Sequence, residues 1–169
     1  MYHAFDESRS IIAIPPAVFA WQMRWLHENG YQVIPLSRLV QYLRNADPLP
    51  ARSVVITFDD GFETIYTYAF PVLVRYGLPA TVFLVAGYCG RQNDWPNRPL
   101  TVPHLSLLSW TQIREMDRRG IEFGAHSLSH PRLDRLAPEK AAPEILDSKA
   151  CIEDRLGHAV ELFLSVWSV

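Results

Sequence analysis

Two short segments carry side chains suited to metal binding and catalysis. A Thr-Phe-Asp-Asp-Gly segment follows an apolar run and contains two adjacent carboxylates, Asp59 and Asp60. A His-Ser-Leu-Ser-His segment follows a second apolar run and places two imidazoles, His126 and His130, four residues apart. One Asp with two His is a good ligand set for a divalent metal, and three protein ligands leave a position open for water. The two segments together indicate a metal-dependent hydrolase site.

The expected chemistry explains why these residue types are needed. Hydrolysis of an amide or ester requires a nucleophile made from water near neutral pH, and a bound metal supplies it by lowering the pKa of that water. Imidazole with carboxylate suits zinc, cobalt, iron or manganese better than calcium, which prefers oxygen ligands alone. A second carboxylate beside the metal can act as general base. Because successive side chains of a strand alternate in direction, Asp59 and Asp60 are expected to take distinct roles, with a turn at Gly61 bringing both towards the site.

Each segment alone is a weak signal. A His-x-x-x-His spacing arises by accident in a chain with six histidines, and Asp-Asp-Gly is also a common turn sequence. Both segments at the ends of predicted strands in one small domain make a stronger case, because α/β proteins place their chemistry at strand ends. Glu63, just after the first segment, is interpreted as a carboxylate at a helix N-terminus rather than as a ligand.

Extended and helical patterns alternate along the chain, which predicts an α/β fold built on a parallel sheet or barrel. Ser109 and Gln112 have the spacing of a capping box and predict a helix start. The region from Gly87 to Leu108 is rich in Gly, Asn and Pro and is expected to form a long loop bordering the site. Strands are predicted at 31–35, 54–58, 80–85 and 121–125, and helices at about 19–29, 37–43, 63–76, 110–119 and within 138–156.

Composition narrows the possible classes of protein. A chain of 169 residues with 49% hydrophobic content suits one domain, and a net charge of -2 gives no reason to expect nucleic acid or an anionic membrane surface as partner. No apolar run of about 20 residues is present, so no transmembrane segment is expected. Cys89 and Cys151 lack a metal-binding spacing; free thiols are favoured, with a disulfide left open. The first residues lack the pattern of a signal peptide, and the localisation stays open.

The paired segments resemble the first two motifs of the polysaccharide deacetylases, the NodB-homology domain of carbohydrate esterase family four. Pro79 to Leu84 resembles a conserved strand of that family, and Leu108-Ser109-Trp110 resembles its usual helix start. Met1-Tyr2-His3 resembles the opening of many bacterial members. The resemblance runs from residue 1 to about residue 157.

This resemblance implies an irregular (β/α) barrel with a metal at the C-terminal ends of its strands. It implies removal of acetyl groups from N-acetylated, or sometimes O-acetylated, sugars of a polysaccharide or oligosaccharide. Members of the family that act on such polymers are commonly exported. Matched residue by residue, Asp59 is the expected general base, and Asp60, His126 and His130 are the expected metal ligands. His3 is expected near the site, where it would contact either the substrate or the residues that surround the metal ligands. Zinc is the expected metal, with cobalt or manganese as alternatives.

The end of the chain departs from the family pattern. Residues 160–169 contain no Arg-Pro-Tyr, Asp-Trp or Leu-x-His segment, and the last of these carries the family's general acid. The expectation is therefore one domain over residues 1–169 whose C-terminal part is missing, with an incomplete barrel and weakened or absent activity. Two alternatives stay open: a non-catalytic metal- or glycan-binding remnant, and a deacylase of a small metabolite or cyclic amide with a closed pocket.

Overall fold

A computed structural model describes residues 1–7 and 10–165 of the chain. At its centre lie three parallel strands, β5 (Thr57–Phe58), β6 (Thr81–Leu84) and β7 (Glu122–Ala125), in the order β5-β6-β7. All four residues of β6 are buried, as expected for the middle strand of a parallel sheet covered on both faces. This order brings the C-terminal ends of β5 and β7 to the same edge, on either side of β6.

Shorter pairings extend the central strands on both sides. β1 (Ala4–Phe5) pairs in parallel with β2 (Ala13–Ile14), and β3 (Gln32–Val33) pairs in parallel with β4 (Ser53–Val54). Parallel bridges join Tyr2 to Phe58 on one side and Ala125 to Phe163 on the other. Within the described residues the strands form an open arc, so the expected α/β architecture with an incomplete barrel is confirmed. None of the family's C-terminal motifs is present in the sequence of residues 160–169. The last four of these, residues 166–169, lie outside the described part of the chain.

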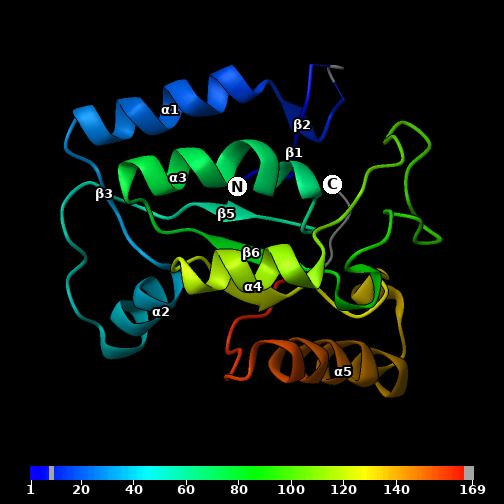
Figure 1. Ribbon diagram of the computed structural model, residues 1–169. Coiled ribbons are helices and arrows are strands. Elements are labelled where there is room, and N and C mark those ends of the chain that lie inside the picture. Colours follow the sequence, from blue (N-terminus) through cyan, green and yellow to red (C-terminus); the bar gives the residue numbers. More distant parts are fainter. Residues whose placement is uncertain (8–9, 166–169) are drawn as a thin grey trace.

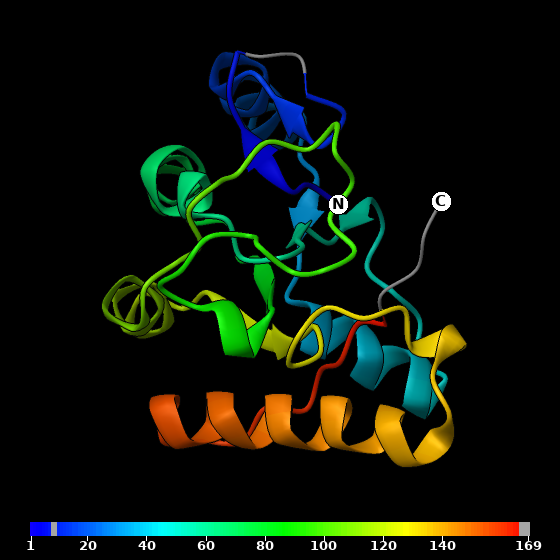
Figure 2. The ribbon, with the colours of Figure 1, turned by 90° about the vertical axis from the view of Figure 1, so that its right-hand side faces the viewer.

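Helices surround the strands, and the loop that follows β6 crosses in front of the strand ends (Figures 1 and 2). No helix of the described part of the chain has the length and hydropathy needed to span a bilayer. The helices are α1 (Pro16–Glu28), α2 (Leu36–Asn45), a π-helix (Ile65–Ala69) leading into α3 (Phe70–Tyr76), α4 (Trp110–Arg118) and α5 (Pro138–Leu156), with short 3-10 helices at Ala86–Tyr88 and Leu133–Arg135.

Several boundaries follow from local sequence. The predicted capping box is present at α4, where the Ser109 side chain accepts from the Gln112 amide and the Gln112 side chain accepts from the Ser109 amide. The predicted helix over 63–76 is π-helical before Pro71, because proline lacks the amide hydrogen that would continue the ordinary bonding pattern. The predicted strand 54–58 is divided, since β4 pairs with β3 whereas β5 pairs with β6.

An aromatic cluster fixes the chain near the first motif. Phe5, Phe19 and Phe58 are fully buried, and Tyr2 packs against all three rings. Ring centroids within the cluster lie 5.0 to 6.3 Å apart, in the range where aromatic pairs attract one another. The cluster joins β1, α1 and β5, and therefore holds the C-terminal end of β5 in place. Away from it, both cysteines are free.

Candidate metal centre

Asp59 and Asp60 leave the end of β5 in a tight turn. Asp60 and Gly61 both have left-handed backbone angles, with φ of 68° and 76°, and the Gly61 amide donates to the Asp59 carbonyl at 2.8 Å. The Asp59 amide donates to the Tyr2 carbonyl, which ties the turn to the neighbouring chain. Both carboxylates are buried, with 6% and 7% exposure. The expected turn at Gly61 is present.

The two histidines are presented by a turn that follows β7. The His126 amide donates to the Leu84 carbonyl at 2.9 Å, so the start of the turn is fixed to β6. Ser127 and His130 have positive φ values of 68° and 62°, and the His130 amide donates to the Ser127 hydroxyl at 3.0 Å. This compact turn returns the His130 ring to the side of the His126 ring, with centroids 5.1 Å apart.

Asp60, His126 and His130 converge on one point. Oδ1 of Asp60 lies 3.4 Å from Nε2 of His126 and 3.2 Å from Nε2 of His130. One ligand atom from each of the three residues lies within 4.8 Å of the others, and all three side chains are largely buried. The structure therefore brings together the three residues that the sequence predicts as ligands.

The hydrogen bonding of His126 tests whether this set fits a metal. Its Nδ1 donates to the Leu164 carbonyl at 2.8 Å, which in the neutral ring leaves a lone pair on Nε2. That lone pair faces the carboxylate of Asp60, so a cation or a proton must lie between the two acceptors. Two imidazole nitrogens and a carboxylate oxygen suit zinc and similar divalent ions. The residues present fit such a metal.

Charges within the site shift the pKa values of its members. Burial opposes ionisation of Asp60, but hydrogen bonds and charge from His126 and His130 outweigh it and hold the pKa of Asp60 below its ordinary value. Burial likewise opposes protonation of His126, whereas Asp60 and the Leu164 carbonyl favour it and leave the pKa of His126 raised. The site thus favours positive charge beside Asp60, whether from a proton or from a metal ion.

Asp59 occupies a different environment from Asp60. Burial raises the pKa of Asp59, partly offset by the positive charges that His3 and His126 can carry. Its Oδ1 is buried and has no hydrogen-bond partner within the described residues, whereas Oδ2 lies 3.9 Å from Nε2 of His3. His3 is partly exposed and borders this carboxylate. The structure places His3 beside Asp59 and gives the two aspartates separate surroundings.

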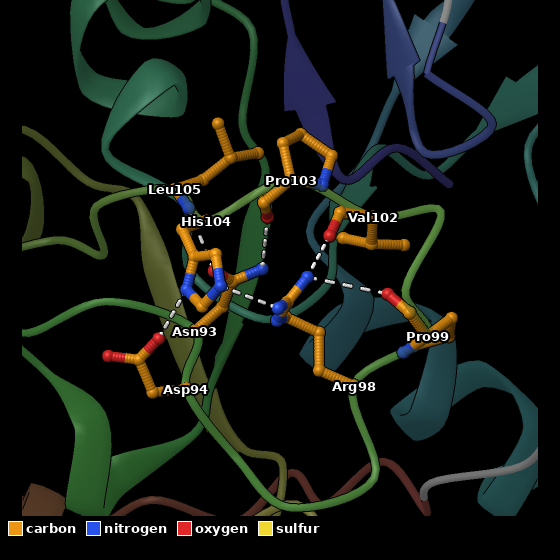
Figure 3. Close-up of polar contacts among 8 residues, drawn as sticks. All are labelled: Asn93, Asp94, Arg98, Pro99, Val102, Pro103, His104 and Leu105. Carbon is orange, nitrogen blue, oxygen red and sulfur yellow. Dashed lines mark hydrogen bonds and ion pairs between the residues drawn. The ribbon is translucent and has the colours of Figure 1, made fainter.

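The long loop after β6 covers one side of the histidine pair. Trp95 is 5% exposed, and its ring lies 4.3 Å from the His130 ring and 5.7 Å from the Tyr88 ring, centroid to centroid. Fully buried Asn93 ties the loop together, since its Nδ2 donates to the Pro103 carbonyl and its Oδ1 accepts from the Leu105 amide (Figure 3).

A second network in the same loop joins three ionisable side chains, those of Asp94, Arg98 and His104. Nδ1 of His104 donates to Asp94 at 2.6 Å, and Nε2 of His104 accepts from Arg98 at 2.6 Å (Figure 3). Arg98 also donates to the carbonyls of Pro99 and Val102. The loop 87–108 is therefore an ordered border of the site, held by its own side chains.

The geometry adds three contacts, two to the histidine rings and one to the turn between them, that residue patterns did not indicate. These are the Leu164 carbonyl on His126, the Trp95 ring on His130, and Glu144, which accepts hydrogen bonds from the turn between the histidines. A carbonyl has no sequence signature, and Trp95 lies in a segment without periodicity. Glu144 lies in a helix whose pattern predicts only its secondary structure.

Comparison with known proteins assigns the chain to a family. The sequence matches the polysaccharide deacetylase family over residues 46–165, a span that contains both motifs. This chain belongs to the polysaccharide deacetylase family. The expected resemblance is confirmed.

Individual relatives support the assignment of this chain to the family. YxkH of Bacillus subtilis (strain 168), itself only provisionally named a polysaccharide deacetylase, is 32% identical over 154 residues, which cover 91% of this chain and 50% of YxkH. The poly-β-1,6-N-acetyl-D-glucosamine N-deacetylase of Staphylococcus aureus (strain MSSA476) is 32% identical over 126 residues, covering 73% of this chain and 40% of that protein. The chain thus spans about half the length of YxkH and less of the staphylococcal enzyme.

A solved structure has the same fold. The structure of IcaB from Ammonifex degensii superposes with a TM-score of 0.82 at 30% identity, covering 98% of this chain and 71% of that one. The open arc of strands described above thus corresponds to most, but not all, of the IcaB chain.

Proposed function

We propose that this polysaccharide deacetylase removes acetyl groups from N-acetylated sugars of a polysaccharide, with a divalent metal, zinc first among the candidates, held by Asp60, His126 and His130. The observation that carries the proposal is the convergence of these three side chains beside Asp59 in a chain of this family. The staphylococcal relative, named for N-deacetylation of a glucosamine polymer, supports an N-acetylated substrate over an O-acetylated one.

The residues around the ligands divide the work of hydrolysis. A bound divalent metal lowers the pKa of water and polarises the acetyl carbonyl. Asp59 is assigned as the general base, because its buried Oδ1 has no partner within the described residues and is available to accept a proton from the attacking water. Burial raises the pKa of Asp59, which makes its ionised carboxylate a stronger base for this proton transfer.

His3 and Trp95 are assigned supporting roles. His3 lies beside Asp59 and is partly exposed, so its ring contacts a sugar that reaches this carboxylate. Trp95 covers His130 and excludes water from that side of the ligand set.

Metal binding and turnover in one preparation test the proposal. Zinc is titrated by calorimetry, and acetate release is measured from β-1,6-linked N-acetylglucosamine oligomers. We expect Asp59→Asn to bind zinc but to lose about 10²- to 10⁴-fold in rate. His126→Ala and His130→Ala lose both zinc and turnover, whereas His27→Ala on the exposed side of α1 matches the unchanged chain.

Other results separate the alternatives. Zinc binding without acetate release from any form supports the metal- or glycan-binding remnant. Release from free N-acetylglucosamine or a cyclic amide, with none from oligomers, supports the small-molecule deacylase. A folded chain that binds no zinc overturns the proposed site.

A further inference from the structure

The turn between the two histidines is held from outside by one carboxylate. Glu144, in α5, accepts hydrogen bonds on Oε2 from the backbone amides of Leu128 at 2.9 Å and Ser129 at 2.8 Å. Its Oε1 accepts from the Ser129 hydroxyl at 2.6 Å. Two successive amides that point at the same oxygen form the concave arrangement that favours an anion.

This turn needs outside support because its backbone is unfavourable. Ser127 and His130 both have left-handed φ values, which side chains with a Cβ rarely adopt. The carbonyls of Ser127 and Leu128 accept from the amides of Ala86 and Gly87 on one side of the turn. The amides of Leu128 and Ser129 face the other side, where Glu144 provides their acceptor. The turn is thus fixed between the start of the long loop and α5.

The conformation of the turn decides where the imidazoles point. His126 and His130 lie at its two ends, and both Nε2 atoms face Oδ1 of Asp60 only while the chain between them keeps its tight return. We propose that Glu144 is a positioning residue for the metal centre: its carboxylate holds the 126–130 turn in the shape that aims both histidines at Asp60. This inference rests on the proposed metal site, and it names Glu144 as one of the groups that fix the directions of the two imidazoles.

Glu144 is not required to hold its own helix in place. α5 packs against β7 and the 3-10 helix Ala86–Tyr88, and its residue Ile152 is fully buried in the core. Figure 2 shows α5 lying below these elements. A variant at Glu144 therefore changes the turn while the helix remains docked, which makes the inference testable by substitution.

The test compares Glu144→Ala with Asp147→Ala, which removes an exposed carboxylate from the same helix. We expect Asp147→Ala to bind zinc like the unchanged chain and Glu144→Ala to bind it about 10- to 100-fold more weakly, the usual cost of losing a group that orients a metal ligand. Glu144→Gln is expected to lie between them, because its amide oxygen can still accept from both backbone amides.

A spectroscopic readout separates positioning from simple loss of stability. With cobalt at saturation, the visible absorption of Glu144→Ala is expected to differ from that of Asp147→Ala, because the two imidazoles no longer meet the metal at the same angles. In the metal-free protein, the amide hydrogens of Leu128 and Ser129 are expected to exchange faster in Glu144→Ala.

Two results would overturn the inference in distinguishable ways. Equal zinc affinity and identical saturated cobalt spectra in Glu144→Ala and Asp147→Ala overturn the role of Glu144 and leave the proposed function standing. Failure of the unchanged, folded chain to bind zinc or cobalt overturns the proposed metal site itself, and the positioning role with it.

Discussion

The imidazole of His126 is oriented by the backbone of Leu164, whose carbonyl accepts from Nδ1 at 2.8 Å. The contact joins residues 38 positions apart in sequence. It exists because the segment after α5 runs beside β7, where the Ala125 amide donates to the Leu162 carbonyl and the Leu164 amide donates to the Ala125 carbonyl. The orientation of a predicted metal ligand thus depends on a pairing that begins well beyond both motifs.

Leu164→Pro is expected to weaken zinc binding by about 10- to 100-fold, the range typical of losing a partner that orients a metal-binding histidine. Proline removes the amide that donates to Ala125 at 2.9 Å and therefore shifts the neighbouring carbonyl away from His126. Leu164→Ala keeps that amide and serves as the matched control. Calorimetric titration that finds the same zinc affinity in both variants would show that the Leu164 carbonyl does not orient the ring.

Gly61→Ala is expected to destabilise the fold by about 2 to 4 kcal/mol. This is the sum of the cost of a left-handed backbone at a residue with a Cβ and the cost of overpacking the core. The backbone φ at Gly61 is 76°, and an added Cβ would meet Cδ2 of buried Leu84 at 2.7 Å. Gly30→Ala is the control, because its φ is 69° and nothing lies within 4 Å of the new atom.

For Gly30→Ala the expected loss is only about 1 kcal/mol, from backbone strain alone. Urea unfolding of the metal-free chains measures both values. An equal loss of unfolding free energy in the two variants would show that the Leu84 side chain moves away from the added Cβ without destabilising the fold.

The position of the site was predictable because it depends on rules that residue types reveal. Parallel strands of an α/β protein end at a common edge, so Asp60 after one strand and His126 after another were expected to meet. The capping box of Ser109 and Gln112 was predictable for a similar reason, since it needs only local spacing. In both cases the residue type itself indicates the role of the side chain. The partner lies either a few residues away in the chain or at the same edge of the sheet.

The contacts that refine the site were not predictable because they involve groups without a pattern. The Leu164 carbonyl belongs to the backbone, and any residue type there would supply it. Glu144 is one of several acids in α5, and only the docking of that helix selects it over Asp147. Likewise, the division of the predicted strand at 54–58 follows from which strands become neighbours, a tertiary property that local pattern does not encode.

Asn93→Ala is expected to loosen the loop 87–108 without unfolding the barrel strands. The substitution leaves the Leu105 amide and the Pro103 carbonyl without their buried partner, at a cost of about 1 to 3 kcal/mol for each unsatisfied group. Because Trp95 lies in this loop, its fluorescence is expected to shift to longer wavelength and amide exchange in the loop to accelerate. Asn97→Ala, at an exposed position of the same loop, is expected to change neither observable.

If Asn93→Ala and Asn97→Ala give the same emission and exchange, the loop is held by other contacts, with the Asp94–His104–Arg98 network the next to be tested.

The pH dependence of stability is expected to contain a small contribution from His158. Hydrogen bonds to the Ala159 carbonyl and to Asp117 favour the protonated ring, and the charge of Glu153 adds to them, so the pKa of His158 is raised above its ordinary value of 6.5. A group whose pKa is raised on folding stabilises the protein below its unfolded pKa and loses that contribution as pH rises through the folded one. Half of the side chain is exposed, so the expected contribution is about 0.5 kcal/mol or less.

The difference in unfolding free energy between the unchanged chain and His158→Asn isolates this contribution, because every other titrating group is common to both. Urea unfolding between pH 5.5 and 8.5 is expected to show the advantage of the histidine at the acid end and its disappearance at the alkaline end, about two pH units above the ordinary histidine pKa. An advantage that grows with pH would reverse the sign and show that folding favours the neutral ring. Asp117→Asn provides the independent check, since it removes the negative charge from one of the two hydrogen-bond acceptors and is expected to reduce the pH dependence without abolishing it.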